Sequence, residues 1–176
     1  MIRLQITDGT AALDSARWLG RLRDDVDFIQ IREKDLNARE LAALVRLALR
    51  VGPKILVNDR LDVALAVGAA GVHLRGSSVP PALVRRIAPP GFVISVAIHD
   101  GVEIPAEADH ALVAPVFQPL SKRGTSPPLG LTGLRRIARA SAIPVIALGG
   151  ITPENAAACM EAGAAGVAGI TLFGFR

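Results

Sequence analysis

Short apolar runs that end in polar residues recur along this chain, and most are followed by a stretch with helical spacing. The most informative run spans residues 27–34 and reads Asp-Phe-Ile-Gln-Ile-Arg-Glu-Lys. If it forms a strand, its successive side chains point to opposite faces. One face then carries Phe28, Gln30, Arg32 and Lys34, and the other carries Ile29, Ile31 and Glu33.

The basic face of this run has two interpretations. It is either the solvated face of an edge strand, or it points into the C-terminal mouth of a parallel barrel, towards an anion. Burying an unpaired charge is very costly, so long basic side chains at such a place indicate an anionic partner. We expect the second arrangement, with Arg32 and Lys34 at the mouth.

The same pattern predicts further strands, with helices between them. Strands are expected over residues 2–6, 27–34, 54–59, 72–74, 92–98, 110–114, 144–148 and 166–170. A short acidic segment, 102–108, is expected to form one of the helices. Helix starts are predicted from capping residues at Thr10 (for a helix through 21), Asn37 with Glu40, Thr132 (for a helix through 140) and Thr152.

Eight strands alternating with about seven helices predict a (β/α)8 TIM barrel formed by one domain over residues 1–176. A partial repeat supports this fold, because Gly-Ala-Ala-Gly-Val at 68–72 recurs at 163–167. The alternative, an open doubly wound sheet, would need a glycine-rich loop after the first strand, and the sequence has none there. The chain ends at Arg176, so the barrel is expected to lack its final C-terminal helix, and a second subunit of a homo-oligomer could cover the gap.

Composition narrows the class of function. Hydrophobic residues make up 51% of the chain, mean hydropathy is +0.40, and there is no tyrosine and one tryptophan. Aliphatic residues suit buried parallel strands, whereas the scarcity of aromatic residues disfavours single-stranded nucleic-acid binding. The net charge of +4 is scattered, which fits small anionic substrates. The sequence shows no leader and no membrane span, so we expect a cytoplasmic enzyme, and Cys159 is expected to be a buried structural thiol.

Polar residues at the predicted strand ends are the candidates for chemistry, because active sites of such barrels lie there. Gly149 and Gly150, before a helix start, suggest a phosphate pocket of backbone N–H groups, to which Thr171 could add a hydroxyl. Asp59 could bind a divalent metal, accept a hydrogen bond or pair with Arg60. Among the histidines, His99 is the one placed for proton transfer, whereas His73 and His110 are expected in the core or at its rim.

An ordered set of motifs covers essentially the whole chain and resembles the thiamine phosphate synthase/TenI family of (β/α)8 barrels. The motifs are Ile-Thr-Asp at 6–8, Gln-Ile-Arg-Glu-Lys at 30–34, Asn-Asp-Arg-Leu-Asp-Val-Ala-Leu at 58–65, Gly-Val-His-Leu at 71–74, Pro-Val-Phe at 115–117, Pro-Pro-Leu-Gly-Leu at 127–131 and Ile-Ala-Leu-Gly-Gly-Ile at 146–151. The resemblance implies one of two activities. The synthase couples hydroxymethylpyrimidine diphosphate to hydroxyethylthiazole phosphate and releases pyrophosphate with magnesium. The TenI-type tautomerase aromatises a thiazole carboxylate phosphate by proton transfer without metal.

The resemblance to the synthase also implies roles for individual residues. The residues implied to act on the diphosphate are Arg32, Lys34 and Lys122, with Ser121 beside Lys122. Gln30 and Asn58 would contact the pyrimidine diphosphate, and Asp59 would bind Mg²⁺. The thiazole phosphate would be bound by Gly130, Gly149, Gly150, Ile170 and Thr171.

Four positions depart from these patterns and keep the alternatives open. The second metal carboxylate of the synthase falls at Ser78, its strand-five serine falls near Ala97, and a loop threonine falls at Pro119. These departures favour the tautomerase, yet the proposed acid/base histidine of the tautomerase falls at Pro115. Asp59 and the 115–122 loop favour the synthase, which is the hypothesis we adopt. The tautomerase is the alternative, and a non-catalytic protein that binds thiazole phosphate or thiamine phosphate is the third reading.

Overall fold

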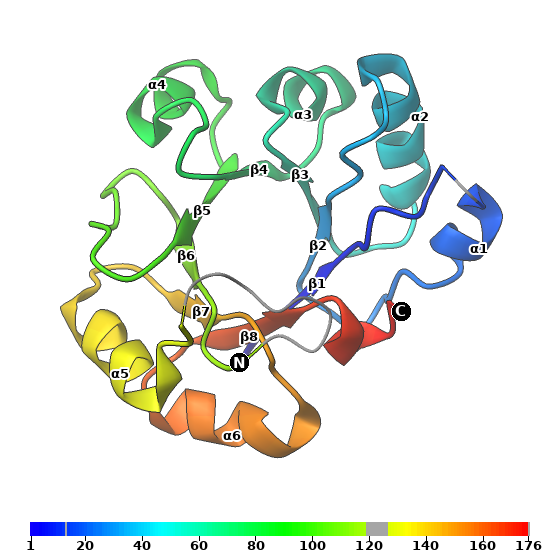
Figure 1. Ribbon diagram of the computed structural model, residues 1–176. Helices are drawn as coiled ribbons and strands as arrows, with labels where there is room; N and C mark the ends of the chain where they lie inside the picture. The colour runs from blue at the N-terminus through cyan, green and yellow to red at the C-terminus, as the bar shows by residue number, and fades with distance from the viewer. Residues whose placement is uncertain (13, 119–126, 176) are drawn as a thin grey trace.

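Eight parallel strands close into a barrel in chain order, from β1 next to β2 round to β8 next to β1 (Figure 1). The computed structural model describes residues 1–12, 14–118 and 127–175. The strands are β1 Ile2–Ile6, β2 Phe28–Ile31, β3 Lys54–Asn58, β4 Gly71–Leu74, β5 Val93–Ile98, β6 His110–Val113, β7 Val145–Ala147 and β8 Gly166–Gly169. The expected (β/α)8 fold is therefore confirmed.

Helices surround the barrel (Figure 1). The described residues form α1 Ser15–Leu19, α2 Ala38–Ala48, α3 Leu61–Val67, α4 Pro81–Ile87, α5 Gly130–Ala140, α6 Pro153–Glu161 and the 3-10 helix η1 Thr171–Phe173. The predicted capping box at Asn37 is present, and the predicted helix start at Thr152 is confirmed, with Thr152 as the N-cap of α6. Cys159 of α6 is fully buried, and burial raises the pKa of its thiol, as expected of a structural cysteine. No helix in the described part of the chain is long and apolar enough to cross a membrane.

Several predicted elements were wrong in extent. The helix expected from Thr10 begins at Ser15, because the Asp14 carboxylate accepts the Arg17 backbone N–H and caps it. Thr132 lies inside α5, which begins at Gly130 without a side-chain cap. Residues 99–109, all of which the structure describes, form no helix between β5 and β6 (Figure 1), since Gly101 takes a left-handed backbone and Pro105 lacks an N–H donor.

Each copy of the repeated Gly-Ala-Ala-Gly-Val segment connects the end of a helix to the start of a strand. Gly68 and Gly163 have positive φ angles of 69° and 98°, where each chain segment turns from its helix. Gly71 and Gly166 then start β4 and β8 so close to the next strand that a Cβ would lie 2.1 Å from the Val93 carbonyl oxygen or 2.2 Å from that of Ile2. Only glycine fits at these two strand starts.

The described residues after β8 form one 3-10 turn, and aromatic side chains pack there. Phe173 and Phe175 are buried, and the Phe175 ring meets Trp18 of α1 edge-on, with ring centroids 6.3 Å apart. Gln5 Nε2 donates a hydrogen bond to the Phe173 carbonyl oxygen at 3.0 Å. In Figure 1 this segment (red) lies beside α1 (blue), where it covers the wall between β8 and β1.

Candidate functional site

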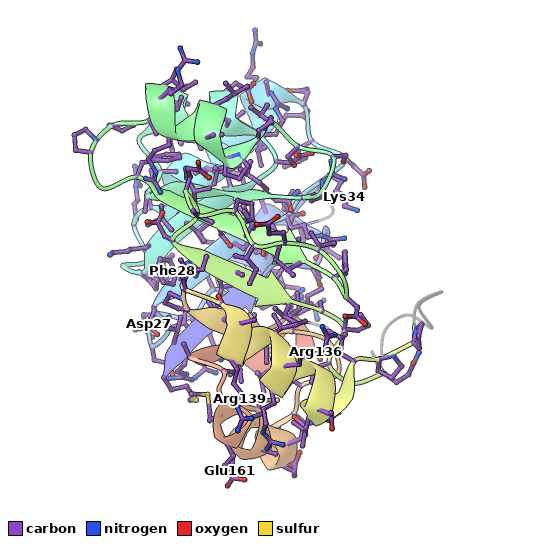
Figure 2. All side chains as sticks on the ribbon, turned by 90° about the vertical axis from the view of Figure 1, so that its left-hand side faces the viewer. Asp27, Phe28, Lys34, Arg136, Arg139 and Glu161 are labelled. Atoms are coloured by element: carbon purple, nitrogen blue, oxygen red, sulfur yellow. The ribbon has the colours of Figure 1, made fainter. Side chains whose placement is uncertain are left out.

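The end of β3 and the segments that follow β2, β3 and β4 bring polar residues into one pocket. Its volume is about 220 Å³, and its lining includes Lys34, Asn58, Asp59, Arg60 and Arg75. Lys34 lies at the opposite end of the barrel from Asp27 and Phe28, as Figure 2 shows. The structure therefore brings three residues implied by the resemblance, Lys34, Asn58 and Asp59, together with Arg75, which the sequence reasoning missed.

The strand predicted over 27–34 is shorter than expected, because β2 ends at Ile31. Beyond it, the Arg32 backbone N–H donates to Thr7 Oγ1 at 2.8 Å, so the chain leaves the sheet here. Arg32 is half-buried and Lys34 is exposed, so both cations lie at the mouth rather than on a strand face. The expected location is thus right, although the strand alternation does not extend to it.

Gln30 and Asn58 form an amide pair across the mouth. Gln30 is 2% exposed, and its Nε2 donates to Asn58 Oδ1 at 3.0 Å. The Gln30 Oε1 atom is buried and has no hydrogen-bond partner among the described residues. This acceptor, which would otherwise be costly to bury, can receive a hydrogen bond from a ligand amine or a water molecule.

Asp59 is held at the turn between β3 and α3 by residues that follow β4. Its φ angle is +62°, a left-handed conformation that aspartate tolerates better than most residues. Its carboxylate accepts hydrogen bonds from Ser78 Oγ and from Arg75 Nη2, and the Ser78 hydroxyl also accepts the Arg75 backbone N–H at 2.7 Å. The expected alternative pair, Asp59 with Arg60, is wrong in its partner, because Arg60 pairs with Asp62 at 2.6 Å.

The electrostatics of this triad favour an ionised Asp59. Partial burial would raise the pKa of Asp59, but the hydrogen bonds from Ser78 and Arg75 and the charge of Arg75 lower it below its ordinary value. Arg75 could have been anticipated from the alternation of β4, since it follows inward-facing His73 by two residues. The strand predicted over residues 72–74 ends one residue before Arg75.

A divalent metal does not fit the donors that surround Asp59. One carboxylate is available, and both of its oxygens already accept hydrogen bonds, one of them from a cation. Within the described ranges, no three histidine, cysteine or acidic side chains gather as a possible metal site. Mg²⁺ prefers several oxygen ligands, of which carboxylates and substrate phosphates are the charged ones. The expected metal role of Asp59 therefore stays a prediction that the local geometry disfavours.

Glu33 is a second residue to which the sequence reasoning assigned no role. It is 5% exposed and accepts hydrogen bonds from Trp18 Nε1 at 3.0 Å and from the backbone N–H groups of Gly9 and Ala11 at 3.2 and 2.9 Å. The signal was present in the alternation of 27–34, which put this one acidic residue on the isoleucine face. Glu33 anchors the segment between β1 and α1 beside the mouth.

The glycine turn after β7 lies on the other side of the mouth. Gly149 and Gly150 have φ angles of 95° and 62°, and a Cβ at either would lie within 2.8 Å of the segment that follows β6. The Asn155 side chain accepts the Thr152 N–H at 2.9 Å and donates to the Gly150 carbonyl at 3.0 Å, which fixes the turn to the start of α6. Close packing alone requires these glycines, so their phosphate role stays a prediction.

The remaining predicted residues divide into three groups. Gly130 takes a positive φ of 63° at the start of α5, while Ile170 and Thr171 are partly buried directly after β8, next to β7. Ser121 and Lys122 lie outside the described residues. The residues that depart from the family patterns, Ala97 and Pro115, are partly buried near the mouth, whereas Pro119 is outside the described ranges.

The three histidines differ in environment. His99 is exposed, and its Nδ1 lies 2.7 Å from the Ala114 carbonyl oxygen. His73 and His110 are buried inside the barrel, as expected, and His73 Nδ1 lies 2.9 Å from Ser95 Oγ. Burial above all lowers the pKa of His73 to about 3 and that of His110 to about 4, so both rings are neutral at pH 7.

Known proteins with similar sequences belong to the family that the motifs resemble. The profile of the thiamine monophosphate synthase family matches residues 6–173. The chain is 42% identical to a protein named thiamine-phosphate synthase from Methanoculleus marisnigri over 82% of this chain and 72% of that protein, and 38% identical to one from Moorella thermoacetica over 97% and 84%.

Solved structures agree with the sequence comparison. The structure of thiamine phosphate pyrophosphorylase from Pyrococcus furiosus superposes with a TM-score of 0.76 at 30% identity, over 97% of this chain and 85% of that one. The 3-hexulose-6-phosphate synthase from Salmonella typhimurium has a TM-score of 0.70 at 16% identity over 98% of this chain and 90% of that one, which shows a shared fold alone. The resemblance inferred from the motifs is thus confirmed, and the chain belongs to the thiamine monophosphate synthase family.

Proposed function

We propose that this chain is a thiamine phosphate synthase, a transferase of thiamine biosynthesis that acts on small phosphorylated substrates. It would couple hydroxymethylpyrimidine diphosphate to hydroxyethylthiazole phosphate. The observation that carries the proposal is that one barrel mouth holds cations beside β2–β4 and a glycine-built turn beside β7, in a chain 42% identical to a protein named thiamine-phosphate synthase. These two regions suit a diphosphate and a monophosphate respectively.

The proposed reaction makes and breaks bonds only between the two substrates, so no side chain of the protein has to form a covalent bond. The bond between the pyrimidine methylene carbon and the diphosphate oxygen breaks, and its electron pair leaves with pyrophosphate. The thiazole nitrogen then donates its lone pair to the methylene carbon, which forms the new carbon–nitrogen bond without any proton transfer. Catalysis therefore consists of holding two substrates in line and stabilising negative charge on the leaving group.

Residue roles follow from this chemistry and are part of the proposal. Arg32 and Lys34 would stabilise the diphosphate from the β2 side, and Lys122 and Ser121, which lie outside the described residues, would also bind it. The Gln30–Asn58 amide pair would orient the pyrimidine, since Gln30 Oε1 is a buried acceptor. Gly130, Gly149, Gly150, Ile170 and Thr171 would line the thiazole phosphate side.

The TenI-type tautomerase is the second candidate. The triad at Asp59 favours it, because Ser78 and Arg75 occupy the carboxylate that a metal-dependent synthase would use. Pro115 argues against it, because proline offers no proton at the position where the resemblance expects an acid/base histidine. The synthase remains the better-supported function of the two.

Turnover of the purified chain with both synthase substrates tests the proposal. We expect thiamine phosphate and pyrophosphate to appear together in equal amounts, and Arg32→Ala to abolish both. Formation of neither product, with turnover of a thiazole carboxylate phosphate instead, would identify the tautomerase. Binding of thiazole phosphate without turnover in either assay would identify a non-catalytic binding protein.

We also propose a cytoplasmic location and a homo-oligomer, both of which rest on the sequence reasoning. Sedimentation at micromolar concentration tests the assembly directly. A species of twice the chain's mass of 18.4 kDa or larger is expected, whereas a strictly monomeric profile would contradict it.

A further inference from the structure

The charge of the Asp59 carboxylate is balanced by Arg75, and both of its oxygens are occupied by hydrogen bonds. Arg75 Nη2 donates to one carboxylate oxygen and Ser78 Oγ to the other, while the Arg75 backbone N–H donates to Ser78 Oγ at 2.7 Å. Each of the three residues thus fixes the other two. A divalent ion that approached Asp59 would have to displace a cation from it, against Coulomb repulsion.

Arg75 also faces the space where a diphosphate would lie. Its side chain is 47% exposed, and it lines the same pocket as Lys34 and Asn58. Its contact with Asp59 uses Nη2, and a guanidinium carries further N–H donors in a planar fork that matches phosphate oxygens. Arg75 can therefore keep its contact with Asp59 and donate to a phosphate at the same time.

We infer that Arg75 supplies at this site the positive charge that a divalent metal would supply, and that it is a further diphosphate-binding residue of the proposed reaction. Asp59 then acts as the group that positions Arg75, and the free protein binds no magnesium through it. This inference rests on the proposed function, because a diphosphate is the anion that would need the charge. Ser78, which departs from the family pattern, fits this arrangement as a hydrogen-bond donor where a second carboxylate would repel Asp59.

The test measures the binding of inorganic pyrophosphate by calorimetry in metal-free buffer with chelator. The wild-type chain is expected to bind pyrophosphate under these conditions, and Arg75→Ala to bind it at least about 10-fold more weakly, as for loss of a charge-assisted hydrogen bond. Arg75→Lys should retain part of the affinity because the charge remains. Arg86→Ala is the matched control, since Arg86 is exposed on α4 and its loss removes one positive charge away from the pocket.

A magnesium titration of the free proteins completes the test. In the absence of pyrophosphate, we expect no heat of magnesium binding from the wild type or from Arg86→Ala, because Arg75 and Ser78 occupy both oxygens of the Asp59 carboxylate. Pyrophosphate binding by the wild type that disappears with chelator, or equal affinity in Arg75→Ala and Arg86→Ala, would overturn the inference. Because these readouts need no turnover, failure of the synthase assay would be seen separately.

Discussion

The interior of this barrel is polar on one side and apolar on the other. Across β2–β6 each strand contributes one inward polar residue, namely Gln30, Asn58, His73, Ser95 and His110, and register pairs connect the last four. Across β7, β8 and β1 the interior is apolar, with Ile146, Ala168 and Leu4 fully buried. The first side meets the mouth with charged and amide side chains, and the second meets it with a backbone turn.

This difference suggests a division of labour between the two anions of the proposed reaction. Side-chain cations such as Arg32, Lys34 and Arg75 can follow a diphosphate as it separates from its carbon and gains charge. The backbone turn is tied to α6 by the hydrogen bond from Asn155 to the Gly150 carbonyl oxygen, and it suits a phosphate that stays in place throughout the reaction. Substitutions on each side should therefore affect different ligands.

The largest effect is expected from Gly149→Ala. The new Cβ would lie 2.8 Å from Pro115 Cα, and the residue would keep a φ of +95° that alanine disfavours. We expect hydroxyethylthiazole phosphate to bind about 100-fold more weakly, because the turn must shift by enough to lose its donor geometry. Calorimetric titration with this phosphate and with pyrophosphate measures both affinities.

Gly52→Ala provides the matched control for backbone strain. Gly52 has a φ of +117° before β3, and no atom lies within 4 Å of the position that its Cβ would take. Because Gly52→Ala adds backbone strain without a steric clash, we expect a smaller loss of stability in thermal unfolding and no change in either affinity. If Gly149→Ala weakened both ligands to the same degree, the turn would not be a separate phosphate site.

A smaller effect of opposite selectivity is expected from Lys34→Ala. Removing one charged donor should weaken pyrophosphate binding about 30-fold, which corresponds to about 2 kcal/mol, and leave thiazole phosphate binding nearly unchanged. Lys54→Ala is the control, because Lys54 is exposed at the start of β3, the opposite end of the barrel from the mouth. Equal losses for the two ligands would remove the assignment of two anion regions.

The sequence predicted the barrel because its strand pattern is local. The strands, the helix caps at Asn37 and Thr152 and the repeated glycine turns each depend on a few neighbouring residues. The failures depend on residues further apart in the chain or on competition between caps. Asp14 caps α1, and the prediction of Thr10 as its cap was wrong.

The site was predicted in position but not in its internal contacts. Alternation correctly directed Gln30 to the barrel interior and Glu33 to the helix side. The residues next to Arg75 in the sequence do not indicate that it contacts Asp59. That contact joins the loops after β3 and β4, which lie together because the two strands pair. Resemblance to the synthase implied a metal role for Asp59, and that role gave no reason to expect the contact that Asp59 makes with Arg75 in the structure.

The smallest effect tests the interior beneath the polar side and appears only in acid. His110 is 3% exposed, its Nε2 has no partner among the described residues, and burial lowers its pKa to about 4. In the unfolded chain a histidine binds its proton near pH 6.5, so the unfolded state gains protons first as the pH falls from about 6.5 towards 4. Folding stability must therefore decrease over that range.

His110→Gln removes this contribution to the acid sensitivity. Between pH 7 and pH 5.5 the wild type is expected to lose on the order of 1 kcal/mol more folding stability than His110→Gln does, measured by urea unfolding. His73 remains in both proteins, so some acid sensitivity persists. His99→Gln, at an exposed histidine, is measured alongside as the control for a His-to-Gln substitution outside the barrel interior. If His110→Gln followed the wild-type curve, the ring would not be held neutral, and the polar side would be hydrated rather than dry.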